Sequence, residues 1–269
     1  MVVRELSQRV AAMPAWDPDV YSRYRAYRDR PALDLMLKIP RDLDPKEIWD
    51  LGCGPGEHAA LLAARHPGAV VHGLDSSPEM LARAKGQGAD VDWVLGDIGS
   101  WTPETPPDLI FTNAALQWLD GHQTLFPRLL TSLAPGGVLA CQIPQVEDAG
   151  WRRSLRELAA CGPWAGRLAA LDGVRKGHDP RAYHDWLSPL ASDLDVWATT
   201  YVHALEGEDP IIDWTSGTSL RPYLERLEPG EETAAFLAAW RARLAEGYPR
   251  RADGITLLPF TRLFVMARR

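Results

Sequence analysis

Residues 48–56 read Ile-Trp-Asp-Leu-Gly-Cys-Gly-Pro-Gly, a short apolar run followed at once by three glycines spaced two apart. The run at 48–51 predicts a buried strand, and residues 57–65, directly after the glycines, show a helical pattern. Glycines at this spacing let the backbone turn tightly and leave its N–H groups open to a ligand. A strand, a glycine loop and a helix in this order predict a ligand-binding α/β fold.

The same alternation of apolar runs and helical patterns continues along the first half of the chain. Further strands are predicted at residues 70–75, 92–95, 109–112 and 138–143. Ser77 before Pro78 predicts the start of a helix, because Ser caps helix N-termini and Pro is favoured in the first turn. Strands that alternate with helices at this spacing predict a parallel sheet covered by helices on both faces.

The second half of the chain has a different pattern. Residues 151–160 and 231–247 predict helices, the latter with an apolar stripe. Residues 194–205 and 255–267 are rich in β-forming residues and are interpreted as the last strands of the same sheet.

These patterns predict how the chain is organised. We expect residues 16–269 to form a single domain, with helical cap segments at about 150–190 and 206–250. Residues 1–15 form an N-terminal extension to which the sequence assigns no role.

Charge and cysteine content exclude several classes of function. The chain has 29 Lys and Arg against 36 Asp and Glu, a net charge of −7, which argues against a nucleic-acid partner. Its three cysteines are widely separated and show no metal-binding spacing, so we expect neither a metal site nor a disulfide. No apolar stretch approaches the ~20 residues of a membrane helix, and we expect a cytoplasmic protein without a membrane partner.

The acidic residues around the glycine loop indicate which ligand it holds. Asp50 precedes a G-x-G-x-G loop, whereas a dinucleotide site has G-x-G-x-x-G. Asp75 ends the second strand, where a carboxylate accepts from ribose hydroxyls, and Asp97 ends the third, where a carboxylate accepts from an adenine amine. An adenosine that carries a positive centre and no phosphate fits these acids, and this describes S-adenosylmethionine.

Longer motifs carry a family resemblance. They are Trp-Asp-Pro at 16–18, Leu-Asp-Ser-Ser-Pro-Glu-Met-Leu at 74–81, Asn-Ala-Ala-Leu-Gln-Trp-Leu at 113–119, Gly-Thr-Ser-Leu-Arg-Pro-Tyr at 217–223 and Leu-Leu-Pro-Phe-Thr-Arg-Leu-Phe-Val at 257–265. In these residues the chain resembles the trans-aconitate 2-methyltransferase family of bacteria, within the class I S-adenosylmethionine-dependent methyltransferases.

The resemblance implies a fold and a reaction. The fold is α/β and Rossmann-like, a seven-stranded, mostly parallel sheet with an antiparallel last strand and helical cap insertions. The reaction transfers a methyl group to a carboxylate of trans-aconitate, giving a monomethyl ester and S-adenosylhomocysteine. The residues expected to bind the cofactor are Asp50, Gly52, Cys53, Gly54, Gly56, Asp75, Ser76, Met80, Asp97, Ile98, Asn113, Ala114 and Gln117.

The acceptor side follows from chemistry and from the resemblance. A carboxylate is already ionised at neutral pH, so we expect alignment of the reactants and no catalytic acid or base. The residues expected to bind a small anionic acid are Arg28, Trp118, Tyr183, His184, Arg221 and Arg262. For Arg221 a surface ion pair with Glu225 or Glu228 is an open alternative, and for the Tyr183-His184 pair a place in the core.

Two features leave the acceptor open. Gln145-Val146 stands where the family usually has Asp-Asn, and His184 where a second tyrosine is typical. One alternative function is therefore methylation of a hydroxyl or carbon atom of another small metabolite. A second is a non-catalytic module that binds S-adenosylmethionine. The sequence leaves open the oligomeric state and which carboxylate is methylated.

Overall fold

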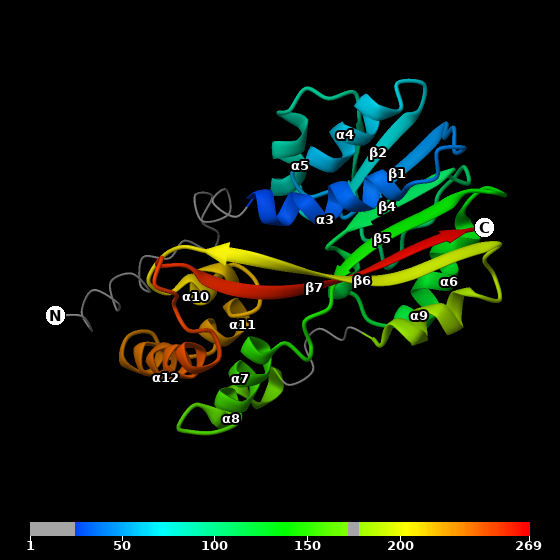
Figure 1. Ribbon diagram of the computed structural model, residues 1–269. Helices are drawn as coiled ribbons and strands as arrows, with labels where there is room; N and C mark the ends of the chain where they lie inside the picture. Colours follow the sequence, from blue (N-terminus) through cyan, green and yellow to red (C-terminus); the bar gives the residue numbers. More distant parts are fainter. Residues whose placement is uncertain (1–24, 172–177) are drawn as a thin grey trace. The chain divides into compact units, whose positions relative to one another are not determined.

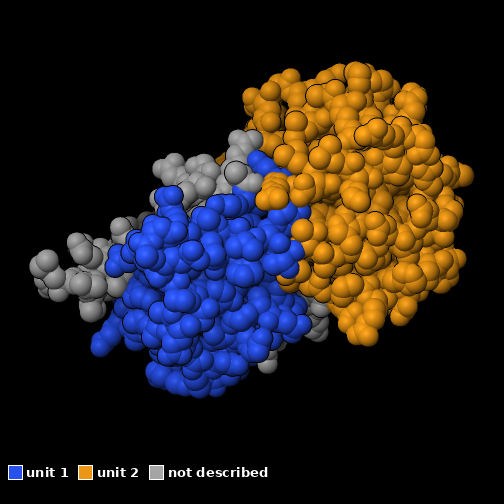
Figure 2. Space-filling view, in the orientation of Figure 1, with its two compact units in different colours: residues 1–29, 146–174, 200–260 blue, residues 30–145, 175–199, 261–269 orange. Residues whose placement is uncertain are grey.

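The computed structural model describes residues 25–171 and 178–269 (Figure 1). The extension predicted at residues 1–15 and the motif at 16–18 lie outside these residues. The chain divides into two compact units, which Figure 2 shows in different colours. Of the described residues, the sheet unit comprises 30–145, 178–199 and 261–269, and the helical unit comprises 25–29, 146–171 and 200–260.

Seven strands and ten helices of the described residues follow one another along the chain. The strands are β1 (Glu47–Leu51), β2 (Val70–Asp75), β3 (Asp92–Leu95), β4 (Leu109–Asn113), β5 (Val138–Pro144), β6 (Asp193–Leu205) and β7 (Thr256–Arg268). The α-helices are α3 (Arg25–Lys38), α4 (Glu57–Arg65), α5 (Pro78–Lys85), α6 (His122–Ser132), α7 (Gly150–Ala159), α8 (Ala165–Leu168), α9 (Pro180–Leu187), α10 (Pro210–Ser216), α11 (Arg221–Leu224) and α12 (Glu231–Gly247). Two short 3₁₀ turns are η1 (Leu116–Trp118) and η2 (Ala169–Leu171).

The strands form one sheet in the order β3-β2-β1-β4-β5-β7-β6. Strands β1 to β5 pair in parallel, whereas β7 runs antiparallel to β5. This confirms the predicted parallel sheet with an antiparallel last strand. The chain moves from β1 outward to β3 and then returns to β4 on the other side of β1, so the direction of winding reverses between β1 and β4 (Figure 1). Ligands of such sheets bind at the carboxyl ends of the strands at this reversal.

One face of the sheet packs against α6 and α9. Ile110 and Leu139 on the strands lie in one buried cluster with Phe126 of α6 and with Tyr183 and Leu187 of α9. Within the segment predicted as a cap at about 150–190, α9 buries Tyr183 and Leu187 in the sheet unit. Helices α7 and α8 of the same segment belong to the helical unit.

The other face of the sheet packs against α3 and α4. The ring of His58 on α4 lies 6.1 Å from the ring of Phe111 on β4. Farther along the sheet, Trp197 of β6 stacks on Phe264 of β7 with 4.9 Å between ring centroids, and Lys38 of α3 lies 5.7 Å from the Trp197 ring. We call this the α3/α4 face.

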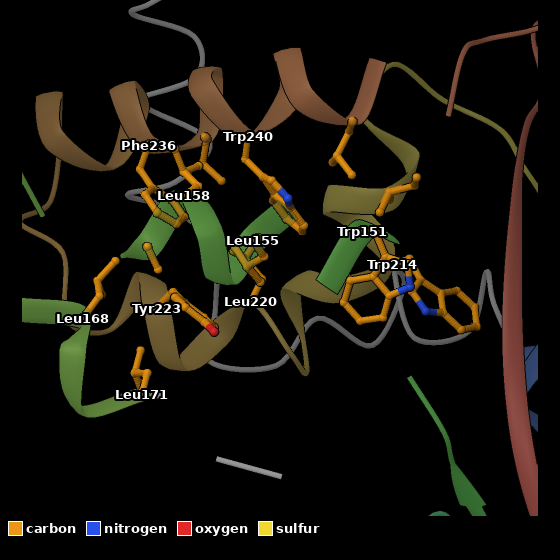
Figure 3. Packing of buried hydrophobic residues seen from close by; sticks show 14 of the residues in the cluster. Trp151, Leu155, Leu158, Leu168, Leu171, Trp214, Leu220, Tyr223, Phe236 and Trp240 are labelled. Carbon is orange, nitrogen blue, oxygen red and sulfur yellow. The ribbon is translucent and has the colours of Figure 1, made fainter. Parts of the chain in front are cut away.

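The helical unit has its own aromatic core. Trp240 of α12 is fully buried with Trp151 and Leu155 of α7, and Figure 3 shows these side chains between the two helices. Phe236 of α12 meets Trp164 edge to face, with 5.0 Å between ring centroids. Phe236 and Trp240 belong to the apolar stripe predicted for residues 231–247, and their burial confirms it.

Within the described residues, every helix is too short or too polar to span a membrane.

Candidate active site

The glycine loop between β1 and α4 is held against β2. The N–H of Gly52 donates to the Leu74 carbonyl over 2.7 Å. Gly52 has a φ of +76°, a conformation that other residues rarely adopt, and the two other glycines of the loop also have positive φ. A Cβ added to Gly52 would lie 2.3 Å from the Cβ of Ala115, in the segment after β4. Only glycine therefore allows the loop to approach this segment so closely.

Asp75, at the end of β2, binds the glycine loop directly. Its Oδ2 accepts from the N–H of Gly54 and its Oδ1 from the N–H of Ser77, each over 2.8 Å. A carboxylate has about four lone-pair sites, so this side chain retains acceptors for a ligand. The hydroxyl of Ser77 also accepts from the N–H of Met80 over 3.2 Å, which confirms the predicted helix cap.

Asp97 and Ile98 follow the end of β3. The side chain of Asp97 is exposed, and its Oδ1 accepts from the N–H of Gly99 over 3.0 Å. Ile98 is buried, and Ser76, after β2, is exposed. The predicted cofactor residues of β1, β2 and β3 thus lie at three neighbouring strand ends of the sheet unit.

Asp50, on β1, is almost fully buried, with 1% of its surface exposed. Burial raises its pKa to about 7; the nearby His58 acts in the opposite direction and the charge of Asp75 adds to the increase. A positive ligand would favour the ionised form of this carboxyl. Burial likewise raises the pKa of the Cys53 and Cys141 thiols, so neither is a thiolate nucleophile at neutral pH.

The segment after β4 turns sharply. Ala114 has a φ of +54° and is the single non-glycine residue of the described chain in this conformation. Its N–H donates to the Gln142 carbonyl over 2.9 Å, and its own carbonyl accepts from the side chain of Gln117 over 2.5 Å. Strained backbone of this kind is often found at ligand sites.

Several buried oxygen atoms near these strand ends have no hydrogen-bond partner in the described part of the chain. They are Asp50 Oδ2, Asn113 Oδ1 and Gln117 Oε1. A buried polar atom left unsatisfied costs about 1–3 kcal/mol. Such oxygens accept hydrogen bonds, so they suit a cation that carries N–H groups and hydroxyls. The residues present therefore fit S-adenosylmethionine.

Four of the predicted substrate residues belong to the sheet unit, and Arg262 and Trp118 are two of them. Arg262 of β7 is buried, with 5% of its surface exposed, and lies opposite Pro144 of β5. Trp118, at the end of η1, is 56% exposed. It follows Asn113 and Gln117 along the segment after β4.

Two others belong to the helical unit. The guanidinium of Arg28 lies 5.4 Å from the ring centre of Trp214. Arg221 forms an exposed ion pair, with 2.6 Å between its Nε and Oε1 of Glu225. The alternative that the sequence leaves open for Arg221 is thus observed.

Tyr183 and His184 are neighbours in α9 but lie in different surroundings. Tyr183 is fully buried, and its hydroxyl lies 2.7 Å from Nδ1 of His122. Nε2 of His122 lies 2.8 Å from the carbonyl of Leu116, in η1. His184 is exposed, 3.8 Å from Asp185. The burial of Tyr183 favours a place in the core over contact with a substrate.

Gln142 of β5 is a candidate site residue that the sequence reasoning missed. Its backbone carbonyl binds Ala114, and neither polar atom of its side chain has a partner in the described chain. The available signal was a single amide in the otherwise apolar run at 138–143.

Comparisons with known proteins agree with this geometry. Residues 48–137 match a family model described as a methyltransferase domain. Trans-aconitate 2-methyltransferase of Methylobacterium radiotolerans is 45% identical, with 96% of this chain and 99% of that protein covered. The enzyme of the same name from Methylobacterium nodulans is 47% identical, with 96% and 99% covered.

Solved structures share the fold at low sequence identity. The YcgJ protein from Bacillus subtilis has a TM-score of 0.58 at 15% identity and covers 89% of this chain and 98% of its own. A phosphoethanolamine N-methyltransferase from Haemonchus contortus, in complex with S-adenosylhomocysteine, has a TM-score of 0.53 at 17% identity over 88% and 52% of the two chains. The chain belongs to the trans-aconitate 2-methyltransferase family of S-adenosylmethionine-dependent methyltransferases.

Proposed function

We propose that this protein transfers a methyl group from S-adenosylmethionine to a carboxylate oxygen of trans-aconitate or a similar small polycarboxylic acid. The products are a monomethyl ester and S-adenosylhomocysteine. The observation that carries the proposal is the set of buried, unpartnered acceptor oxygens on β1, β4 and η1. They occur in a chain that is 47% identical to a trans-aconitate 2-methyltransferase.

The donor side uses residues of the sheet unit. The remaining lone pairs of Asp75 accept from ribose hydroxyls, and Asp97 is available to an adenine amine. Asp50 and the side-chain oxygen of Asn113 favour the positive part of the cofactor. When bound, S-adenosylmethionine supplies a methyl group activated by a sulfonium.

The acceptor side needs little acid–base chemistry. A carboxylic acid with an ordinary pKa near ~4 is ionised at neutral pH and attacks without a general base. The protein's task is then to hold the attacking oxygen in line with the methyl carbon, and such positioning can lower a barrier by roughly 7–11 kcal/mol. Arg262 is suited to this task, because a guanidinium matches a carboxylate with two parallel hydrogen bonds.

Transfer of a radiolabelled methyl group to a panel of mono-, di- and tricarboxylic acids tests the proposal. We expect a base-labile product with trans-aconitate. A base-stable product would instead indicate a hydroxyl or carbon acceptor. Calorimetric binding of S-adenosylmethionine without turnover of any acceptor would indicate a non-catalytic module.

A further inference from the structure

We propose that the side-chain amide of Gln142 binds a carboxylate of the acceptor acid, next to Arg262. This rests on the proposed function and adds a residue to its acceptor site. Gln142 would be a specificity-determining residue, because its amide recognises the acid without adding charge to the site.

The register of the sheet places Gln142 among the right neighbours. Its Cα is paired with that of Asn113 on β4 and, on the other side, with that of Phe264 on β7. Arg262 is two residues before Phe264 and is paired with Pro144. Residues paired across strands, and residues two apart along a strand, share a sheet face. Asn113, Gln142 and Arg262 therefore project from the same α3/α4 face near the carboxyl end of β5.

The burial of Gln142 indicates that its amide serves a ligand. The residue is 1% exposed, and both Nε2 and Oε1 lack a hydrogen-bond partner in the described chain. Buried polar groups in folded proteins are nearly always hydrogen-bonded, and an exception needs an explanation. The other residues of the run at 138–143 are apolar, so packing alone would be satisfied by an apolar side chain here.

The order of the strands favours the acceptor over the cofactor as the ligand of Gln142. The cofactor residues Gly52 and Asp75 follow β1 and end β2, and Asn113 ends β4, whereas β5 lies beyond β4, two strands from β1. Strands are spaced about 4.8 Å apart, so this separation is about 10 Å. The buried cation Arg262 on the same face also opposes a positive ligand and favours an anion. The Nε2 of Gln142 is a donor that a carboxylate oxygen can use.

The substitution Gln142→Met tests the assignment, because it keeps the length of the side chain and removes both polar atoms. We expect the KM for trans-aconitate to rise about 10- to 100-fold, the range of a lost hydrogen bond to a charged group. The dissociation constant of S-adenosylhomocysteine should stay within about twofold, and the melting temperature should not fall, since no internal hydrogen bond is lost. Gln123→Met, on the exposed side of α6, is the matched control and should change neither constant.

Gln142→Glu provides a second variant, because a carboxylate at this position repels the acid. Gln142→Glu should weaken binding of the acid more than Gln142→Met does. The control variant Gln123→Glu should not weaken binding of the acid. Binding of trans-aconitate to protein loaded with S-adenosylhomocysteine, measured by calorimetry, separates affinity from turnover for each folded variant.

The outcomes distinguish this inference from the proposed function. If the wild type methylates trans-aconitate and Gln142→Met does so with an unchanged KM, the assignment of Gln142 is wrong and the function stands. An equal loss of cofactor and acid affinity also refutes it, because Gln142 would then belong to the cofactor site. If the wild type methylates no acid, the proposed function fails and this inference fails with it.

Discussion

Replacing Gly52 by alanine would test the geometry of the cofactor loop. The structure gives two separate reasons why this substitution destabilises the folded chain. The positive φ of +76° costs an L-residue about 1–2 kcal/mol. The added Cβ would also lie 2.3 Å from the Cβ of Ala115.

The second penalty sets the size of the effect. Carbon atoms in contact lie about 3.5–4.0 Å apart, so the glycine loop and the segment after β4 would have to separate by more than about 1 Å. Forcing extra atoms into a packed site costs about 1–3 kcal/mol. We expect Gly52→Ala to lower the free energy of unfolding by about 2–5 kcal/mol and to weaken S-adenosylmethionine binding, because both segments carry predicted cofactor residues.

A neighbouring glycine supplies the control. Gly54 also has a positive φ, of +55°, but an added Cβ there meets no atom within 4 Å. Gly54→Ala should therefore carry the conformational penalty alone, about 1–2 kcal/mol. The double variant Gly52→Ala, Ala115→Gly should recover most of the difference. Urea denaturation and calorimetry of all three variants measure these effects, and equal losses for Gly52→Ala and Gly54→Ala, with no recovery in the double variant, would refute the steric argument.

Three further predictions concern single side chains. Asp50 has a pKa raised to about 7 from an ordinary 3.8, so between these pH values the folded chain holds a proton that the unfolded chain releases. The free energy of unfolding should therefore fall as pH rises from about 3.8 to about 7. Denaturant titrations at several pH values measure this fall, which Asp50→Asn should flatten. Asp75→Asn should weaken S-adenosylmethionine binding at least about tenfold by calorimetry, because an amide cannot accept from Gly54, Ser77 and the ribose together; unchanged affinity would contradict this. Trp118→Phe should leave stability within about 0.5 kcal/mol, since the side chain is exposed, and should retain cofactor affinity while losing acid turnover; full turnover would remove the indole from the site.

Local pattern was sufficient to predict most of the fold. The helices predicted at residues 57–65 and 231–247 have those bounds in the structure, and the two late β-rich runs became β6 and β7. In residues 231–247 the predicted apolar stripe is the side that is buried, with Phe236, Leu237, Trp240 and Leu244 in the core. The family resemblance also implied the seven strands and the antiparallel last strand, whereas the order of the strands within the sheet was not predicted.

The division of the chain into units could not be predicted in the same way. The pattern of an amphipathic helix indicates that one of its sides is buried, but it does not indicate which surface covers that side. Nothing in the residues of α9 states that Tyr183 packs on Phe126, whose ring centroid lies 4.8 Å away. The sequence likewise left open whether Arg221 binds the substrate or pairs with Glu225 or Glu228 on the surface. The roles of the predicted site residues in binding stay predictions.

Gln142 shows why a site residue can be harder to find than a fold. Sequence patterns report what stabilises the folded chain, and an amide inside an apolar strand stabilises nothing there, since its polar atoms are buried without partners. Such a residue stands out only once the register shows it beside Asn113 and Arg262. Local rules of folding are expected to fail mainly at functional or strained positions. Gln142 departs from them near the carboxyl end of β5, the strand next to β4. This departure is therefore evidence of binding, because packing would favour another residue.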